Sequence, residues 1–245
     1  MSQNKLNTWA YKLFRPILSP LFKWYYNPQI INKNVIPKNG PILIVGNHKH
    51  LMDQCSVIIS TKRVIHYMAK KEYFGGNKAW FFKAVGCIPV DREAHDGVAK
   101  NIALDVLKDG GAIGLFPEGT RNKTNDKLLL PFKFGTVSMA QKTNATIIPY
   151  AITGDYKFRS KNLMVRFGKP FKVGIDENLE NANQRLFAEI ERLMQENLTA
   201  TNHSLEDELN SRCQDTKKWR YKIFYMFFNL YHFFQKNDIS MIYFK

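Results

Sequence analysis

The chain has 245 residues and a formal net charge of +15, with 36 Lys plus Arg against 21 Asp plus Glu, which indicates an anionic partner. Cys55, Cys87 and Cys213 form no Cys-x-x-Cys pair, so neither a disulfide framework nor a cysteine-based zinc site is expected. No secretory signal is visible, and no apolar run reaches about 18 residues, so a conventional spanning helix is not predicted.

Basic residues dominate residues 1–175 and 209–245, whereas residues 176–208 are acidic. Aromatic residues make up 13% of the chain and concentrate at its two ends. Basic and aromatic side chains together are typical of membrane interfaces. We therefore predict an anionic membrane surface as a partner, and no nucleic acid.

Residues 3–26 show apolar side chains at spacings of three and four, which predicts an amphipathic helix bent or broken at Pro16 and Pro20. This helix either packs on the domain or lies on a membrane surface. Residues 28–40 read as a loop or irregular strand. We assign residues 1–34 to an N-terminal membrane-associated segment.

Residues 35–200 alternate between short apolar runs and helical patterns. Strands are predicted at residues 41–46, 64–69, 86–92, 112–116, 146–153 and 163–167. Helices are predicted at residues 54–61, 74–85, 94–108, 131–142 and 183–200. This alternation predicts an α/β domain, in which a layered, mostly parallel or mixed sheet is flanked by helices.

A histidine and an aspartate follow the first of these strands. His48 and Asp53 lie where the strand gives way to a helix, a position at which α/β folds place chemistry. A carboxylate that accepts a hydrogen bond from one ring nitrogen leaves the other free to take a proton. His48 is therefore a candidate general base oriented by Asp53.

Two other strands also end in polar residues. Asp91 and Arg92 end the third strand, and Glu118, Thr120 and Arg121 follow the fourth. Carboxyl ends of parallel strands meet at one edge of a sheet, so these groups are expected in one crevice with His48. Because a guanidinium binds two phosphate oxygens at once, the set indicates chemistry on a hydroxyl near a phosphate.

Four motifs occur in order along this region. Asn47, His48 and Asp53 fit Asn-His-x-x-x-x-Asp, residues 86–92 end in Asp-Arg, residues 116–121 read Phe-Pro-Glu-Gly-Thr-Arg, and Pro149 interrupts an apolar strand. With these motifs the chain resembles the glycerolipid acyltransferase family, and in particular bacterial 1-acylglycerol-3-phosphate acyltransferases, over residues 35–175. His50 departs from the serine common in that family.

The resemblance implies an acyltransferase of phospholipid biosynthesis that converts 1-acylglycerol 3-phosphate to phosphatidic acid. His48 would deprotonate the free hydroxyl of the lysophospholipid as it attacks an acyl thioester, presented by acyl-CoA or acyl carrier protein. The substrate-binding residues would be Arg92 and Arg121 on the phosphate, with Glu118, Gly119 and Thr120 beside them. No metal or cofactor is implied, and the expected location is the cytoplasmic face of the membrane, peripheral or monotopic.

Three alternatives remain open at this point. A metallohydrolase could use His48, His50 and Asp53 as ligands, although no second paired histidine motif accompanies them. Cys55 could act as a nucleophile with His48. A non-enzymatic basic membrane-binding protein would explain the charge but not the three polar strand ends.

Residues 201–245 form a linker and a basic, aromatic C-terminal segment. Four cations at residues 217–222 precede a run rich in phenylalanine and tyrosine that is too short and too interrupted to span a bilayer. We predict an interfacial membrane anchor, with a helix folded onto the domain as the alternative.

Overall fold

The computed structural model describes residues 6–77, 79–91, 97–124 and 127–202. Residues 1–198 form one compact unit, and residues 199–245 form a second, of which residues 199–202 are described. The predicted C-terminal anchor and Arg92 therefore lie outside the described residues. The three-part division predicted from the sequence remains a prediction.

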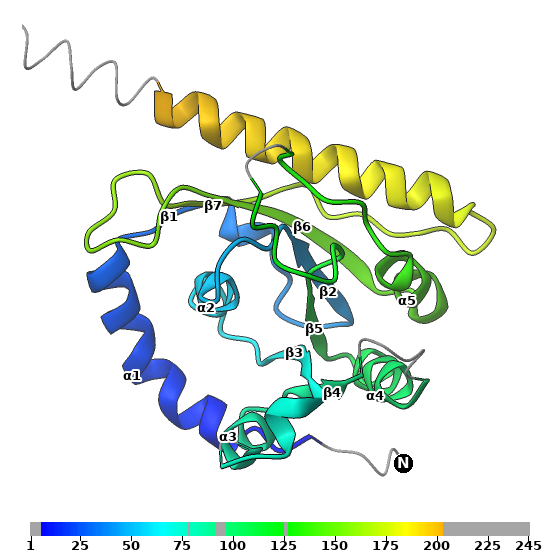
Figure 1. Ribbon diagram of the computed structural model, residues 1–245. Coiled ribbons are helices and arrows are strands. Elements are labelled where there is room, and N and C mark those ends of the chain that lie inside the picture. The colour runs from blue at the N-terminus through cyan, green and yellow to red at the C-terminus, as the bar shows by residue number, and fades with distance from the viewer. Residues whose placement is uncertain (1–5, 78, 92–96, 125–126, 203–245) are drawn as a thin grey trace, which may run out of the picture. The chain divides into compact units, whose positions relative to one another are not determined.

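The elements of the first unit alternate between strands and helices along the chain (Figure 1). The strands are β1 (Gln29–Ile31), β2 (Ile42–Gly46), β3 (Ile65–Lys70), β4 (Ile88–Val90), β5 (Ala112–Leu115), β6 (Thr146–Thr153) and β7 (Met164–Phe167). The helices are α1 (Trp9–Tyr26), α2 (Asp53–Ile58), α3 (Ala79–Ala84), α4 (Gly97–Lys108) and α5 (Gly135–Thr143), with 3-10 turns η1 (Lys33–Val35) and η2 (Lys71–Phe74). Residues 179–202 are also helical.

The strands form one seven-stranded sheet in the order β1-β7-β6-β2-β5-β3-β4. Strands β6, β2, β5, β3 and β4 pair in parallel, whereas β7 runs antiparallel to β6 and parallel to β1. Strand β2 lies at the centre, and all five of its residues are buried. The central strands therefore end at one edge of the sheet, where the loops after β2 and β5 lie side by side.

Alternate residues of β2 bury opposite faces of the sheet, as the period of two in a strand requires. Leu43 and Val45 pack in a cluster that includes residues of α4, α5 and helix 179–202. Ile42 and Ile44 pack in a second cluster, which includes Val57 of α2. Figure 1 shows α1 and α2 on one side of the sheet and α4 and α5 on the other. The architecture is a layered α/β fold with a mixed sheet, as the sequence predicted.

Helix α1 continues through Pro16 and Pro20, so the prolines do not break it. Two hydrogen-bonding side chains join it to the unit. Tyr11 donates to the carbonyl of Arg63 at 3.1 Å, and Arg15 donates to the carbonyls of Ile58 and Thr61. The face bearing Tyr11 is thus seated on the domain.

Two sequence predictions differ in detail. Within residues 28–40, for which the sequence predicts a loop or irregular strand, residues 29–31 form the short strand β1. Of the helix predicted over residues 74–85, residue 74 ends the 3-10 turn η2 and only residues 79–84 form an α-helix, α3. The pair Gly75-Gly76 separates the two pieces, since glycine disfavours a continuous helix.

Candidate active site

Asn47 fixes the point at which the chain leaves β2. Its buried side chain donates to the carbonyl of Ile152 at 2.8 Å and accepts from the Ile152 N–H at 2.7 Å. One amide therefore satisfies both backbone groups of a β6 residue where the strand pairing ends. This bond anchors the following turn to the neighbouring strand.

The turn brings Asp53, the first residue of α2, back to His48. The Nδ1 atom of His48 lies 2.8 Å from Oδ2 of Asp53, and Asp53 is 1% exposed. The same oxygen accepts the backbone N–H groups of Lys49 at 2.7 Å and His50 at 2.8 Å. Because these donors stabilise an ionised carboxylate, His48 donates through Nδ1 and keeps Nε2 as a proton acceptor.

The other carboxylate oxygen of Asp53 bonds to a residue distant in sequence. The Tyr156 hydroxyl, in the loop after β6, donates to Oδ1 at 2.9 Å. Ser56 of α2 lies 2.9 Å from the same hydroxyl. Burial, together with the neighbouring charge of Asp53, raises the pKa of Tyr156, so its hydroxyl stays protonated and acts as a donor.

The backbone of His48 is held from the loop after β5. Oε1 of Glu118 accepts the His48 N–H at 2.9 Å, and Oε2 accepts the Leu130 N–H at 2.9 Å. Asn122 donates its backbone N–H to the His48 carbonyl at 2.7 Å. Burial raises the pKa of Glu118, which is only 4% exposed. Two residues of one loop thus fix the His48 peptide groups.

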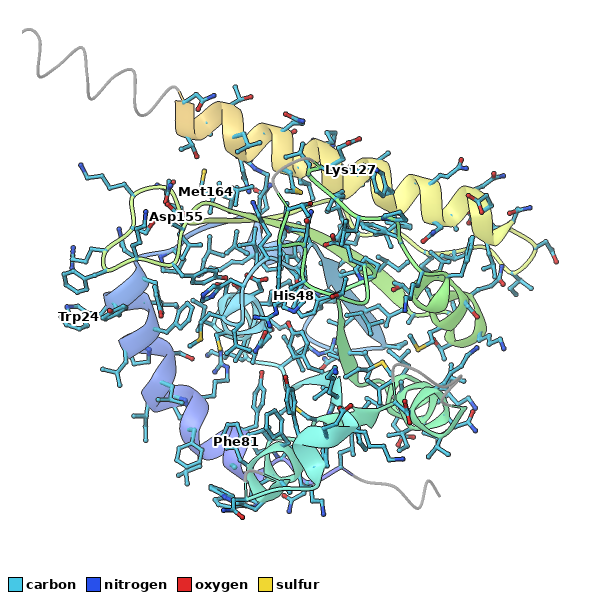
Figure 2. The ribbon with its side chains drawn as sticks, viewed as in Figure 1. Trp24, His48, Phe81, Lys127, Asp155 and Met164 are labelled. Carbon is cyan, nitrogen blue, oxygen red and sulfur yellow. The ribbon has the colours of Figure 1, made fainter. Side chains whose placement is uncertain are left out.

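The imidazole lies flat on an aromatic ring. The ring centroids of His48 and Phe116 are 3.9 Å apart and the planes differ by 13°. Phe116 stacks in turn on Tyr67 of β3, whose ring lies where a Cβ on Gly114 would be. In Figure 2 His48 lies among the side chains at the centre of the unit. Glycine at position 114 therefore makes room for the column of rings that supports the base.

A cavity of about 210 Å³ lies beside this column. Its lining is mainly apolar and includes Lys100 and Lys133, the complete set being Met68, Lys100, Leu115, Phe116, Pro117, Gly119, Lys133, Gly135, Thr136 and Met139. Gly119 adopts a φ of +71°, and a Cβ there would meet the Lys133 side chain. Glycine is thus favoured at this turn for both reasons.

The structure brings together some of the predicted site residues. His48, Asp53 and Glu118 share one hydrogen-bonded network, and Gly119 lines the adjoining cavity. Thr120 and Arg121 follow on an exposed turn of the same loop. The substrate contacts assigned to these residues and to Arg92 remain predictions.

The geometry bears on the alternative chemistries. Within the described part of the chain, no three His, Cys, Asp or Glu side chains form a group that could hold a metal ion. The His50 ring stacks on Tyr156 at 4.5 Å, and its Nδ1 accepts the Met52 N–H. Burial and the charge of Asp53 raise the pKa of Cys55 to about 11, which disfavours the thiolate that a nucleophile requires.

Sequence reasoning missed several residues of this network. Asn47 belongs to the first motif, but the motif predicts no role for it. Asn122 lies one position beyond the third motif and so is not singled out by it. Tyr156 carried no signal at all, because its partner Asp53 is 103 positions away. Short-range spacing finds the pair of His48 and Asp53 but cannot find a contact between two loops.

Part of the chain matches a known protein family, and several known proteins have similar sequences. The family described as Acyltransferase matches residues 27–153. The 1-acyl-sn-glycerol-3-phosphate acyltransferase of Bacillus subtilis is 31% identical over 188 residues, covering 74% of this chain and 89% of that protein. The protein of the same name from Borreliella burgdorferi is 32% identical over 139 residues, covering 54% of each chain.

A solved structure shares the architecture. The crystal structure of the 1-acyl-sn-glycerophosphate (LPA) acyltransferase PlsC from Thermotoga maritima matches with a TM-score of 0.58 and 19% sequence identity. The match covers 76% of this chain and 87% of the other. At this identity the likeness concerns the fold.

Proposed function

The chain belongs to the acyltransferase family, and from this premise we propose that it acylates 1-acylglycerol 3-phosphate to give phosphatidic acid. The observation that carries the proposal is the His48–Asp53 pair, 2.8 Å apart, at the carboxyl end of the central strand. The relatives from Bacillus subtilis and Borreliella burgdorferi bear the name of this activity. The donor is an acyl thioester, carried by acyl-CoA or by acyl carrier protein.

The chemistry follows from the tautomer that Asp53 stabilises. Nε2 of His48 takes the proton of the acceptor hydroxyl as its oxygen bonds to the thioester carbonyl carbon. The resulting imidazolium is stabilised by Asp53, which stays ionised. Collapse of the tetrahedral intermediate breaks the C–S bond, and the proton passes from His48 to the leaving thiolate. The thioester is already activated, so no acyl-enzyme is needed.

The acceptor's phosphate is assigned to the arginines. Arg121 is exposed on the loop that also supplies Glu118 to the His48 backbone, so a phosphate bound there would lie near the base. Arg92 follows β4 and is the second candidate. Glu118, Gly119 and Thr120 shape the acceptor site between them, with Glu118 acting through the backbone that it holds.

Helix α1 supports docking to a membrane surface. Its outward stripe carries large apolar side chains that are 45–60% exposed, namely Trp9, Leu13, Ile17, Leu18, Leu21, Trp24 and Tyr25. Trp24 points outward at the periphery in Figure 2. None of the helices in the described residues has the length and hydropathy to span a membrane. An apolar stripe of this kind suits insertion at headgroup depth, with Lys12 and Lys23 near anionic lipid.

Turnover of purified protein tests the proposal, with 1-acylglycerol 3-phosphate and other lysophospholipids as acceptors and each donor type in turn. His48→Ala and Asp53→Asn should lower kcat by about 10² to 10⁴, as expected for loss of a positioned base. His66→Ala is the matched control, because it removes a β3 imidazole that bonds the carbonyl of Gly86 and leaves the site intact. Retention of more than about a tenth of the turnover in His48→Ala would contradict the mechanism.

A further inference from the structure

The hydrogen bonds to Asp53 are unevenly divided between its two oxygens. Oδ2 accepts from the His48 ring and from two backbone N–H groups of its own turn. Oδ1 accepts from the Tyr156 hydroxyl at 2.9 Å. A carboxylate rotates about its Cβ–Cγ bond, so a donor on Oδ1 fixes the plane in which Oδ2 faces His48.

The Tyr156 hydroxyl is itself held as a donor. It has one proton, and the anionic Oδ1 is the stronger of its two acceptors. Ser56, 2.9 Å away on α2, then donates to the phenol oxygen. The chain of bonds runs from Ser56 through Tyr156 and Asp53 to Nδ1 of His48, and each bond in it joins a donor to an acceptor.

The Tyr156 ring is packed against α1. Its centroid lies 5.5 Å from that of Tyr26 at an interplanar angle of 84°, and 6.5 Å from that of Phe22 at 68°. The same loop bonds to the helix through the Arg159 N–H, which donates to the Tyr25 carbonyl. Phe158 contacts Trp24 and Tyr25 edge-on. The C-terminal turns of α1 therefore support one side of the Tyr156 ring, which also stacks on His50.

We propose that Tyr156 is a positioning residue that holds the Asp53 carboxylate in plane and couples the His48 base to the seating of α1. Both Tyr156 and α1 lie outside residues 27–153, which the acyltransferase family matches, so the coupling joins two segments that flank the matched region. The helix that would rest on the lipid surface then also supports the base. This inference rests on the proposed acyl transfer.

Tyr156→Phe tests the hydroxyl alone, because the variant keeps the ring and its packing on α1. Losing a hydrogen bond to a charged group changes an equilibrium constant by roughly tenfold or more. We therefore expect kcat to fall about tenfold while KM for both substrates stays unchanged. Tyr73→Phe is the matched control, since it removes a hydroxyl from a ring that is 47% exposed and stacks on Phe82. Its kcat should equal that of the unaltered protein.

Tyr26→Leu tests the link to α1 without touching the site. It removes the ring that packs edge-on against Tyr156. We expect it to lower kcat by less than Tyr156→Phe does, with KM unchanged. An unaltered kcat in Tyr26→Leu would overturn the coupling to the helix. Thermal melting accompanies both variants, and a loss of kcat that merely tracks a fall in Tm would overturn the positioning role in favour of a structural one.

A second readout is independent of turnover. The downfield proton resonance of the His48 Nδ1–H, identified by its absence in His48→Ala, should move further downfield in Tyr156→Phe, because Asp53 loses a competing donor. An unchanged resonance, or a kcat within about twofold of the unaltered protein, would overturn the proposal. If the unaltered protein itself showed no acyl transfer, the proposed function would fail, and the resonance would still decide whether Tyr156 bonds to Asp53.

Discussion

Glu118→Gln separates two roles for a residue that the sequence assigned to the substrate site. In the structure both carboxylate oxygens accept backbone N–H groups, from His48 and from Leu130, each at 2.9 Å. A glutamine has one acceptor oxygen, so at least one of these N–H groups would face an amide NH₂ and lose its bond. Leaving a buried donor unsatisfied costs about 1–3 kcal/mol. We expect the free energy of unfolding to fall by this amount and kcat to fall with it.

The loss of unfolding free energy in Glu118→Gln should depend on pH, and the raised pKa of Glu118 fixes the direction of that dependence. Burial raises the pKa of Glu118 in the folded state, so its protonated form contributes to the free energy of unfolding. This contribution is fully present below the ordinary glutamate pKa of about 4.3. That contribution is lost as the pH rises through the raised value, because the unfolded chain then holds fewer protons than the folded one. Glutamine does not titrate. The difference in unfolding free energy between the unaltered protein and Glu118→Gln should therefore become smaller from acidic to neutral pH.

Urea unfolding at several pH values, together with steady-state kinetics, measures both effects. Glu72→Gln is the matched control, because the Glu72 side chain is 68% exposed and the change should alter the free energy of unfolding by no more than about 0.5 kcal/mol. The reasoning would be refuted by a Glu118→Gln protein of unchanged stability whose only defect is a raised KM for the acceptor. Glu118 would then contact substrate directly.

Two other predictions concern the substrates and the membrane. Arg121→Ala should raise KM for the acceptor far more than for the thioester, because its guanidinium is assigned to the acceptor phosphate; an effect on the donor alone would reassign it. Replacing Leu21 and Trp24 of α1 by serine should weaken sedimentation with phosphatidylglycerol vesicles. Replacing the exposed Ile175, which lies outside α1, should not, and equal losses in the two proteins would refute docking through α1.

Much of the fold could be predicted from the sequence because the strands are short, buried and bounded by turns. The runs at residues 42–46 and 112–115 are apolar throughout and the run at residues 146–153 is mainly apolar, which is the pattern of strands covered on both faces. The sequence predicts only a loop or irregular strand where β1 lies, since its three residues are exposed or half-buried and their pairing with β7 depends on a segment more than 130 positions away. Pairing with a strand distant in sequence produces no pattern in the local sequence.

The candidate site divides in the same way. The bond between His48 and Asp53 spans five positions, so a turn followed by a helix was enough to predict it. The position of Glu118 was also predicted, but its partners were not, because they are backbone groups at His48 and Leu130 that only the folded loops bring together. Side-chain to backbone bonds carry no sequence pattern at the accepting or donating peptide.

The His48 ring and the His48 peptide are held by different parts of the chain, and this difference decides which substitutions separate catalysis from folding. The peptide N–H is fixed by the buried side chain of Glu118, whose loss leaves backbone donors unpaired and so reduces stability, and the peptide carbonyl is fixed by the backbone N–H of Asn122. The ring is oriented by Asp53, whose own plane depends on the half-buried Tyr156. Removing the Tyr156 hydroxyl spares the ring and its packing, so it should affect proton transfer more than unfolding. The Tyr156 hydroxyl, which orients the imidazole through Asp53, is therefore a group whose removal should change activity while the fold stays intact.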